Sequence, residues 1–390
     1  MVRGRTICVV GFLACLLGST LAHGQARPAD QGQRPLLSEE AFKNVQVLRG
    51  IPVKEFMETM GFFAASLSLN CTDCHGGASA SSWANYADDT PLKQTARRMV
   101  LMVNGINNTN FGGARSVTCY TCHRGNQHPK VIPSLAAQYA EPAEEDPDEI
   151  ELLPGARVTV TPEQILDKYV QAVGGAAALD KLTSFTAKGT YEGFDSDFGK
   201  MPVDIYAKAP NLRTTVVHMS AGESTTTYDG REGWAAGPTD LVPVPLLPLL
   251  GANLEGARLD AQLAFPRQIK QTLTDWRGGF PALNIGGRPV DVIDGKMPGG
   301  TRIKLYFDKQ TGLLVRQARY TNTMVGTVTT HIVYSDYRAL PGVGVRVPFQ
   351  WQVTWVDGQS TITLTSVQPN VPIDAARFTK PTPPGATARQ

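Results

Sequence analysis

CTDCH at residues 71–75 and CYTCH at residues 119–123 are two copies of the pattern C-x-x-C-H, and they begin 48 positions apart (119 − 71). In each copy, two thiols three positions apart lie on the same side of a helical turn. Both can therefore add to the vinyl groups on one edge of a porphyrin, while the imidazole of the next residue ligates the iron. The pattern predicts two covalently bound haem c groups. The thioethers come from Cys71, Cys74, Cys119 and Cys122, and the proximal iron ligands are His75 and His123.

The cysteine count agrees with this interpretation. The chain has six cysteines, of which four belong to the two motifs. Cys8 and Cys15 lie in an apolar N-terminal stretch that we expect to be removed, so no thiol remains for a disulfide. Two C-x-x-C pairs could instead form a zinc site or a redox-active dithiol. A four-cysteine zinc site would not require a histidine directly after both pairs, so haem is favoured.

The N-terminus carries the features of an export signal. Arg3 and Arg5 are basic, residues 7–22 are mostly apolar, and GQA at residues 24–26 is a small-x-small cleavage site. We expect a signal peptide over residues 1–26, with cleavage after Ala22 as the alternative. Haem is attached to C-x-x-C-H outside the cytoplasm, so we expect a periplasmic protein. An uncleaved segment that anchors the protein at the outer face of the inner membrane is the other interpretation.

Charge and composition divide the mature chain into three parts. Removing residues 1–26 removes two arginines and no acid, so the formal charge of the chain falls from +2 to 0. This net charge does not indicate a nucleic-acid partner.

Seven of the eleven residues from Glu141 to Glu151 are acidic. We expect an extended linker over residues 133–157. It separates a dihaem cytochrome c domain at residues 27–132 from a β-rich domain at residues 158–385.

The first domain is predicted to be α-helical. Residues 52–67 have apolar side chains at spacings of 4, 3 and 4, and Thr90 followed by Pro91 marks the start of a second helix. Each helix precedes one motif. A methionine thioether is a common second axial ligand of haem iron. A methionine pair lies upstream of each motif: Met57 and Met60, then Met99 and Met102. Methionines on an apolar helical face can equally be core residues.

Residues 96–107 and the stretch VTCYTCHRG at residues 117–125 resemble the cytochrome c subunit of photosynthetic reaction centres. The resemblance covers roughly residues 40–130 and implies, by position, that Met60 is the distal ligand of the first haem and Met99 that of the second. The alternatives, each one turn away, are Met57 and Met102. The family usually carries four haems, whereas this sequence has two motifs, so the resemblance implies a half-length, dihaem relative.

The resemblance also implies a function. Members of the family transfer electrons, so we expect an electron carrier and not an enzyme. A membrane-bound reaction centre, whose photo-oxidised pigment such a subunit re-reduces, is the redox partner that the family implies, and a respiratory complex is the alternative. Two other functions stay open: a lipid- or lipoprotein-binding protein whose haem domain senses redox state, and a dihaem peroxidase. Peroxidases usually leave one iron open, whereas both motifs here have upstream methionines.

The region after the linker is predicted to be an α+β domain with a mostly antiparallel, curved sheet. A capping box that begins at Thr161 predicts a helix. Alternating apolar and polar residues over residues 303–320 and 351–367 predict hairpins. One further helix is expected at residues 268–276, where apolar side chains recur at spacings of 4 and 3.

This order of elements resembles the periplasmic lipoprotein-carrier fold, an open half-barrel closed by helices over an apolar cavity. The resemblance implies an apolar or lipid ligand, and the proline-rich apolar run at residues 241–250 is a candidate lid. His218 and His331 are isolated, and the sequence of this region contains none of the common hydrolase, phosphate-loop or zinc-protease motifs. We therefore expect a binding or docking domain.

Overall fold

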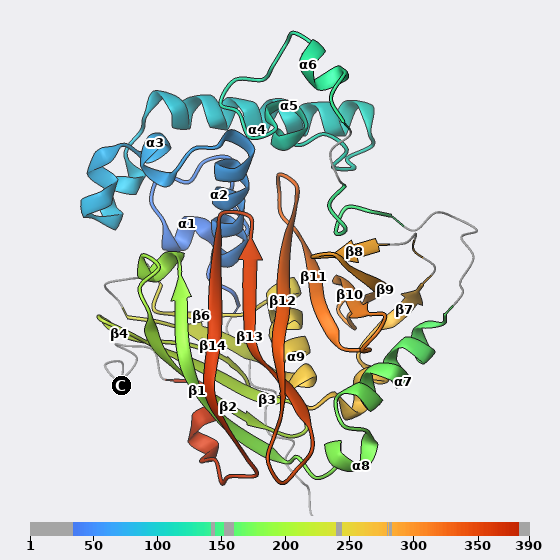
Figure 1. The fold of residues 1–390 in the computed structure, drawn as a ribbon. Helices are drawn as coiled ribbons and strands as arrows, with labels where there is room; N and C mark the ends of the chain where they lie inside the picture. The colour runs from blue at the N-terminus through green and yellow to red at the C-terminus, as the bar shows by residue number, and fades with distance from the viewer. Residues whose placement is uncertain are drawn as a thin grey trace, which may run out of the picture. The chain divides into compact units, whose positions relative to one another are not determined.

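The structure is a computed structural model that describes residues 34–141, 145–151, 160–238, 244–278, 280 and 283–381. An N-terminal helical region is followed by a large antiparallel, curved sheet that does not close into a barrel (Figure 1). Both features agree with the predicted fold class. The predicted signal peptide lies outside the described residues, as do parts of the linker and of the apolar run at residues 241–250. Among the described residues, no helix is both long enough and apolar enough to cross a membrane.

The helical region contains two long helices and several short ones. α2 spans Val53–Leu67 and α4 spans Pro91–Asn110, so both predicted helices are confirmed. Thr90 caps α4, because its hydroxyl oxygen accepts a hydrogen bond from the Lys93 amide at 3.2 Å. The remaining elements are α1 (Ser38–Ala41), α3 (Cys71–His75), η1 (Gly77–Ser81), η2 (Trp83–Ala87), α5 (Cys119–His123) and α6 (Leu135–Gln138).

The C-terminal region is one antiparallel sheet with the strand order β6-β5-β4-β3-β2-β1-β14-β13-β12-β11-β10-β9-β7, and β8 pairs with β9 beside this path. Most neighbours are consecutive in sequence because hairpins join them, as the alternating pattern predicted, whereas β1 pairs with β14 and joins the two ends of the domain. The strands are β1 (Ser184–Gly193), β2 (Met201–Lys208), β3 (Leu212–Met219), β4 (Gly222–Tyr228), β5 (Gly233–Ala236), β6 (Leu246–Pro248), β7 (Thr274–Arg277), β8 (Leu283–Ile285), β9 (Arg288–Lys296), β10 (Arg302–Asp308), β11 (Leu314–Asn322), β12 (Thr327–Ala339), β13 (Arg346–Trp355) and β14 (Gly358–Pro369).

Two longer helices pack on this sheet. α7 (Pro162–Ala172) begins at the predicted capping box, and its Tyr169 ring lies 5.3 Å from the Phe307 ring of β10, centroid to centroid. α9 (Gly251–Ala264) contacts β3, β4, β5 and β11 (Figure 1). Gly256 allows this approach, since a Cβ there would lie 1.5 Å from the guanidinium of Arg319. The short elements are α8 (Ala176–Leu179), η3 (Phe194–Ser196), η4 (Pro266–Gln271) and η5 (Ala375–Phe378).

The prediction of a helix at residues 268–276 is wrong. η4 is a short 3-10 run, and Thr274–Arg277 forms strand β7, which pairs with β9. Asp275 has a left-handed backbone conformation (φ 51°) that a right-handed helix does not contain. The helical spacing in the sequence therefore marked buried side chains but not a helix. The longer helix in this part of the chain is α9, immediately upstream.

Part of the expected linker is not an extended, solvated chain. Residues 145–151 lie against β10, β11 and β12, and Asp148 is only 3% exposed. The acidic run predicted self-repulsion, but its carboxylates pair with Arg316 and Arg302, which lie more than 150 positions away in the sequence. Partners so distant in the chain cannot be found from local composition.

Candidate haem attachment sites

Each C-x-x-C-H motif forms a single helical turn that reciprocal caps hold together. In α3, the Asn70 side-chain oxygen accepts a hydrogen bond from the Asp73 amide at 3.1 Å, and the Asp73 carboxylate accepts one from the Asn70 amide at 2.8 Å. Thr118 and Thr121 make the same two bonds in α5, at 3.3 and 3.0 Å. Helices this short are not stable alone. The caps therefore keep the two thiols of each motif on one turn.

Helix α4 anchors both motifs. Near its start, the Thr90 hydroxyl donates to the Cys74 carbonyl at 2.5 Å. Near its end, the buried Asn107 side chain accepts from the Val117 amide at 3.0 Å and donates to the Val117 carbonyl at 2.8 Å. These anchors are 17 residues apart (107 − 90), about 25 Å along a helix. The four cysteines do not converge on one zinc site, since the described residues contain no group of three or more Cys, His, Asp or Glu that could hold a metal ion.

The two histidines have the hydrogen bonding that a metal ligand requires. Nδ1 of His75 lies 3.0 Å from the carbonyl oxygen of Tyr86, and Nδ1 of His123 lies 3.0 Å from the carbonyl oxygen of Asn126. A carbonyl only accepts, so Nδ1 carries the hydrogen and Nε2 keeps its lone pair. Such a bond fixes the ring and its tautomer at metal sites. Burial lowers the pKa of His75, which favours the neutral form that ligates iron.

The four described cysteines are unpaired thiols. Cys71 and Cys122 are exposed, whereas Cys74 and Cys119 are partly buried. Burial raises the pKa of Cys119 to about 11 and also raises the pKa of Cys74. Each motif thus pairs an accessible thiol with one set against the protein. Neither pair is used in a disulfide, so both are available for thioethers.

The methionines lie on the predicted helices, but each helix contacts more than one part of the region. Met60 and Met99 are partly buried, whereas Met57 and Met102 are 36% and 47% exposed. α2, which carries Met60, contacts the second motif turn α5, and α4, which carries Met99, contacts both α3 and α5. Met60 and Cys119 pack against the same apolar cluster. The order of helix and motif in the sequence does not by itself pair each methionine with one iron.

Several large apolar side chains are exposed on the elements that carry the motifs and close to them. An apolar macrocycle would cover such side chains, so their exposure fits a porphyrin at these turns. Tyr86 also stacks on Trp83, with ring centroids 5.0 Å apart, and lies 4.7 Å from the ring of His75. The exposed side chains are Trp83, Leu101, Met102, Phe111 and Tyr120.

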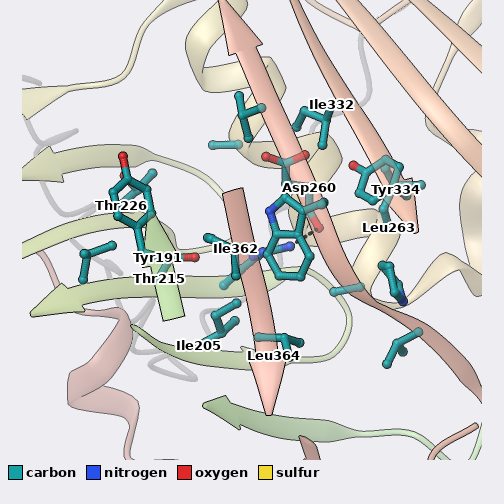
Figure 2. A pocket seen from close by; sticks show the side chains of 18 of the residues that line it. Tyr191, Ile205, Thr215, Thr226, Asp260, Leu263, Ile332, Tyr334, Ile362 and Leu364 are labelled. Atoms are coloured by element: carbon teal, nitrogen blue, oxygen red, sulfur yellow. Dashed lines mark hydrogen bonds between the residues drawn. The ribbon is translucent and has the colours of Figure 1, made fainter. Parts of the chain in front are cut away.

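A separate cavity of about 330 Å³ lies on the side of the sheet that α9 covers (Figure 2). Its walls are mainly apolar but include several polar side chains, among them Asp260 of α9, which accepts a hydrogen bond from the side-chain amide of Gln317 at 2.9 Å. Arg213 lies 5.6 Å over the Trp351 ring and donates to the Asp260 carbonyl at 3.2 Å. The apolar lining includes Phe185, Ile205, Val217, Ile332, Ile362 and Leu364.

Comparison with solved structures gives distant neighbours that cover just over half of this chain. A DUF1329 family protein of Desulfovibrio piger aligns with 57% of this chain and 98% of its own, at 13% identity and a TM-score of 0.40. A LolA superfamily protein of Nitrosomonas europaea aligns with 57% of this chain and 99% of its own, at 14% identity and a TM-score of 0.37.

Comparison with curated sequences finds relatives that match about a quarter of this chain. The photosynthetic reaction center cytochrome c subunit of Thermochromatium tepidum is 37% identical over 110 residues, which are 27% of this chain and 26% of the relative. That of Rubrivivax gelatinosus is 37% identical over 100 residues, 24% of this chain and 25% of the relative. The chain thus spans about a quarter of the length of these relatives. The family model of the photosynthetic reaction centre cytochrome C subunit matches residues 20–172. The resemblance predicted from the two motifs is therefore confirmed: this part of the chain is similar to the reaction-centre cytochrome c subunit family.

Proposed function

We propose that the mature protein is a periplasmic dihaem c-type cytochrome that transfers electrons. The observation that carries this proposal is the repeated geometry of the two motif turns. In each, two thiols lie on one capped turn and the adjacent histidine donates Nδ1–H to a main-chain carbonyl, which leaves Nε2 for iron. The match with cytochrome c subunits supports haem c as the cofactor.

Each type of site residue has one proposed role. Cys71, Cys74, Cys119 and Cys122 would hold the two porphyrins, and His75 and His123 would ligate the irons from one side. Haem c, when bound, supplies a one-electron ferric/ferrous couple. The protein fixes each histidine through its carbonyl partner and excludes water with the apolar side chains around the turns. Met60 and Met99 are the proposed distal ligands, with Met57 and Met102 as alternatives, and a methionine ligand stabilises ferrous iron.

The proposed domains follow the sequence boundaries: a signal peptide at residues 1–26, a dihaem domain at 27–132, a connecting segment at 133–157 and a β-rich domain at 158–385. The proposed electron acceptor is the photo-oxidised pigment of a membrane-bound reaction centre, because the curated relatives are subunits of that complex by name. A respiratory complex is the alternative.

The test of carrier function compares electron transfer with small-molecule reactivity. We expect the purified mature protein to reduce and reoxidise reversibly, and its ferrous spectrum to stay unchanged under carbon monoxide because both irons have two protein ligands. It should not consume hydrogen peroxide above the rate in buffer. A carbon monoxide shift in the wild-type protein together with peroxide turnover would instead assign a haem enzyme. Re-reduction of flash-oxidised pigment in reaction-centre membranes then tests the partner.

The cavity favours a second function, binding of an apolar ligand by the β domain. Its volume is at the small end of ligand sites. We expect a radiolabelled long-chain fatty acid to bind in equilibrium dialysis, a readout that haem absorbance does not disturb. Ile362→Trp should fill the cavity and abolish binding, whereas Thr365→Trp, at an exposed position of the same strand, should not. Equal binding by both variants would remove the cavity as the site.

A further inference from the structure

We infer that β10, β11 and β12 form a docking surface that holds the helical haem region at both of its ends, with the acidic segment 145–151 as a clasp. This inference concerns how the two regions are joined and does not depend on the redox partner. Two sets of contacts carry it. They lie at opposite ends of the helical region in the sequence, yet both fall on the β11–β12 hairpin and its neighbours.

The clasp is centred on the Asp148 carboxylate. It accepts a hydrogen bond from the Tyr306 hydroxyl at 2.8 Å, lies 3.1 Å from Nδ1 of His331, and pairs with Arg316. Asp146 also contacts Arg316, at 3.3 Å. Burial alone would raise the pKa of Asp148, but the contacts with His331 and Arg316 outweigh burial, so the pKa is lowered. The carboxylate is therefore held in its charged form against the sheet.

Main-chain carbonyls of the same segment satisfy a buried lysine. Lys304 is 0% exposed, and its ammonium donates to the carbonyls of Asp148 at 2.8 Å, Ile150 at 2.6 Å and Pro147 at 3.4 Å. Without the segment, an ammonium that lies on an apolar strand would lose these three acceptors, which is costly for a buried charge. The sheet surface and the segment are thus complementary.

A bidentate ion pair closes the clasp at its far end. Glu151 receives two hydrogen bonds from the Arg302 guanidinium, at 2.6 and 3.0 Å. Arg302 is held in turn by Asp294, at 2.9 Å. Because this pair is more exposed than Asp148, we expect it to orient the segment more than to stabilise it.

The second contact lies at the start of the helical region. Phe62 of α2 packs in one cluster with Val325 and Val328, at the turn between β11 and β12. Gly326 makes room for it, since a Cβ there would lie 2.5 Å from Cζ of Phe62. The side-chain amide of Asn253 in α9 also donates a hydrogen bond to the carboxylate of Glu58 in α2, at 2.9 Å.

Hydrogen exchange of the mature holoprotein tests the clasp. Asp148→Asn keeps the shape of the side chain but removes the charge that pairs with Arg316, and we expect amide exchange in residues 145–151 to become at least tenfold faster. Glu149→Gln is the matched control, because it makes the same change at an adjacent exposed position and should leave exchange as in the wild type. Equal exchange in Asp148→Asn and the wild type, or no protection in the wild type, would overturn the clasp.

The second contact is tested by an added methyl group. Gly326 does not have a positive φ, so Gly326→Ala strains no backbone and changes only the contact with Phe62. We expect faster exchange in α2 and, combined with Asp148→Asn, a larger maximum dimension in small-angle scattering. Gly105→Ala, which adds a methyl where no other side chain lies within 4 Å, is the control. A double variant as compact as the wild type, with both haems retained, would overturn docking at both ends.

Discussion

Met60→Ala and Met99→Ala are each expected to open one iron to carbon monoxide and to lower one of the two midpoint potentials. Loss of the thioether removes the ligand that stabilises ferrous iron. Axial ligands shift haem potentials over a range of about 0.8 V, so the change should be large compared with the error of a titration. The wild-type sulfur-to-iron charge-transfer band should lose about half of its intensity in each variant.

Three further methionine variants complete this experiment. Met57→Ala and Met102→Ala should leave both irons closed, and a carbon monoxide shift in either would move the distal ligand by one turn. Met219→Ala, in β3, should change neither potential. Because α2 contacts α5 and α4 contacts both motif turns, the helix contacts leave open which methionine ligates which iron. The potential that changes in each variant identifies the iron that this methionine ligates. Unchanged spectra in both Met60→Ala and Met99→Ala would show that these residues are core residues and not iron ligands.

Cys71→Ser/Cys74→Ser and Cys119→Ser/Cys122→Ser should each halve the covalently bound haem. The caps of α3 and α5 are formed within each turn, and the two turns have separate anchors on α4, so loss of one site should leave the other intact. The measurement is haem absorbance per chain after denaturation. Circular dichroism shows whether each variant retains its fold. A folded variant that still carries two covalent haems would contradict the assignment of its cysteines.

Local signals in the sequence predicted much of the fold. Thr90 and Thr161 marked helix starts because an N-cap and a proline act within one turn, and alternation marked hairpins because a strand buries every second side chain. The prediction of a helix at residues 268–276 was wrong because the same apolar spacing also suits a kinked 3-10 run followed by a strand. α9 was missed since it begins with a glycine and has no side-chain cap at its start.

For the haem sites too, local sequence predicted some features and not others. The cysteines and histidines follow from one five-residue motif, but their support does not. The acceptors of the two Nδ1–H groups are main-chain carbonyls, which any residue could supply. Asn107 and Thr90 anchor the motifs through main-chain groups 10 and 16 positions away. The Asp148 clasp joins residues 168 positions apart, which only the folded sheet brings together.

The central claim, that each C-x-x-C-H turn carries a haem, is tested most directly by the intact mass of the mature protein from a strain competent for haem attachment. We predict the mass of the processed chain plus two haems. A mass that corresponds to one haem, to none, or to a chain with bound zinc would contradict the account.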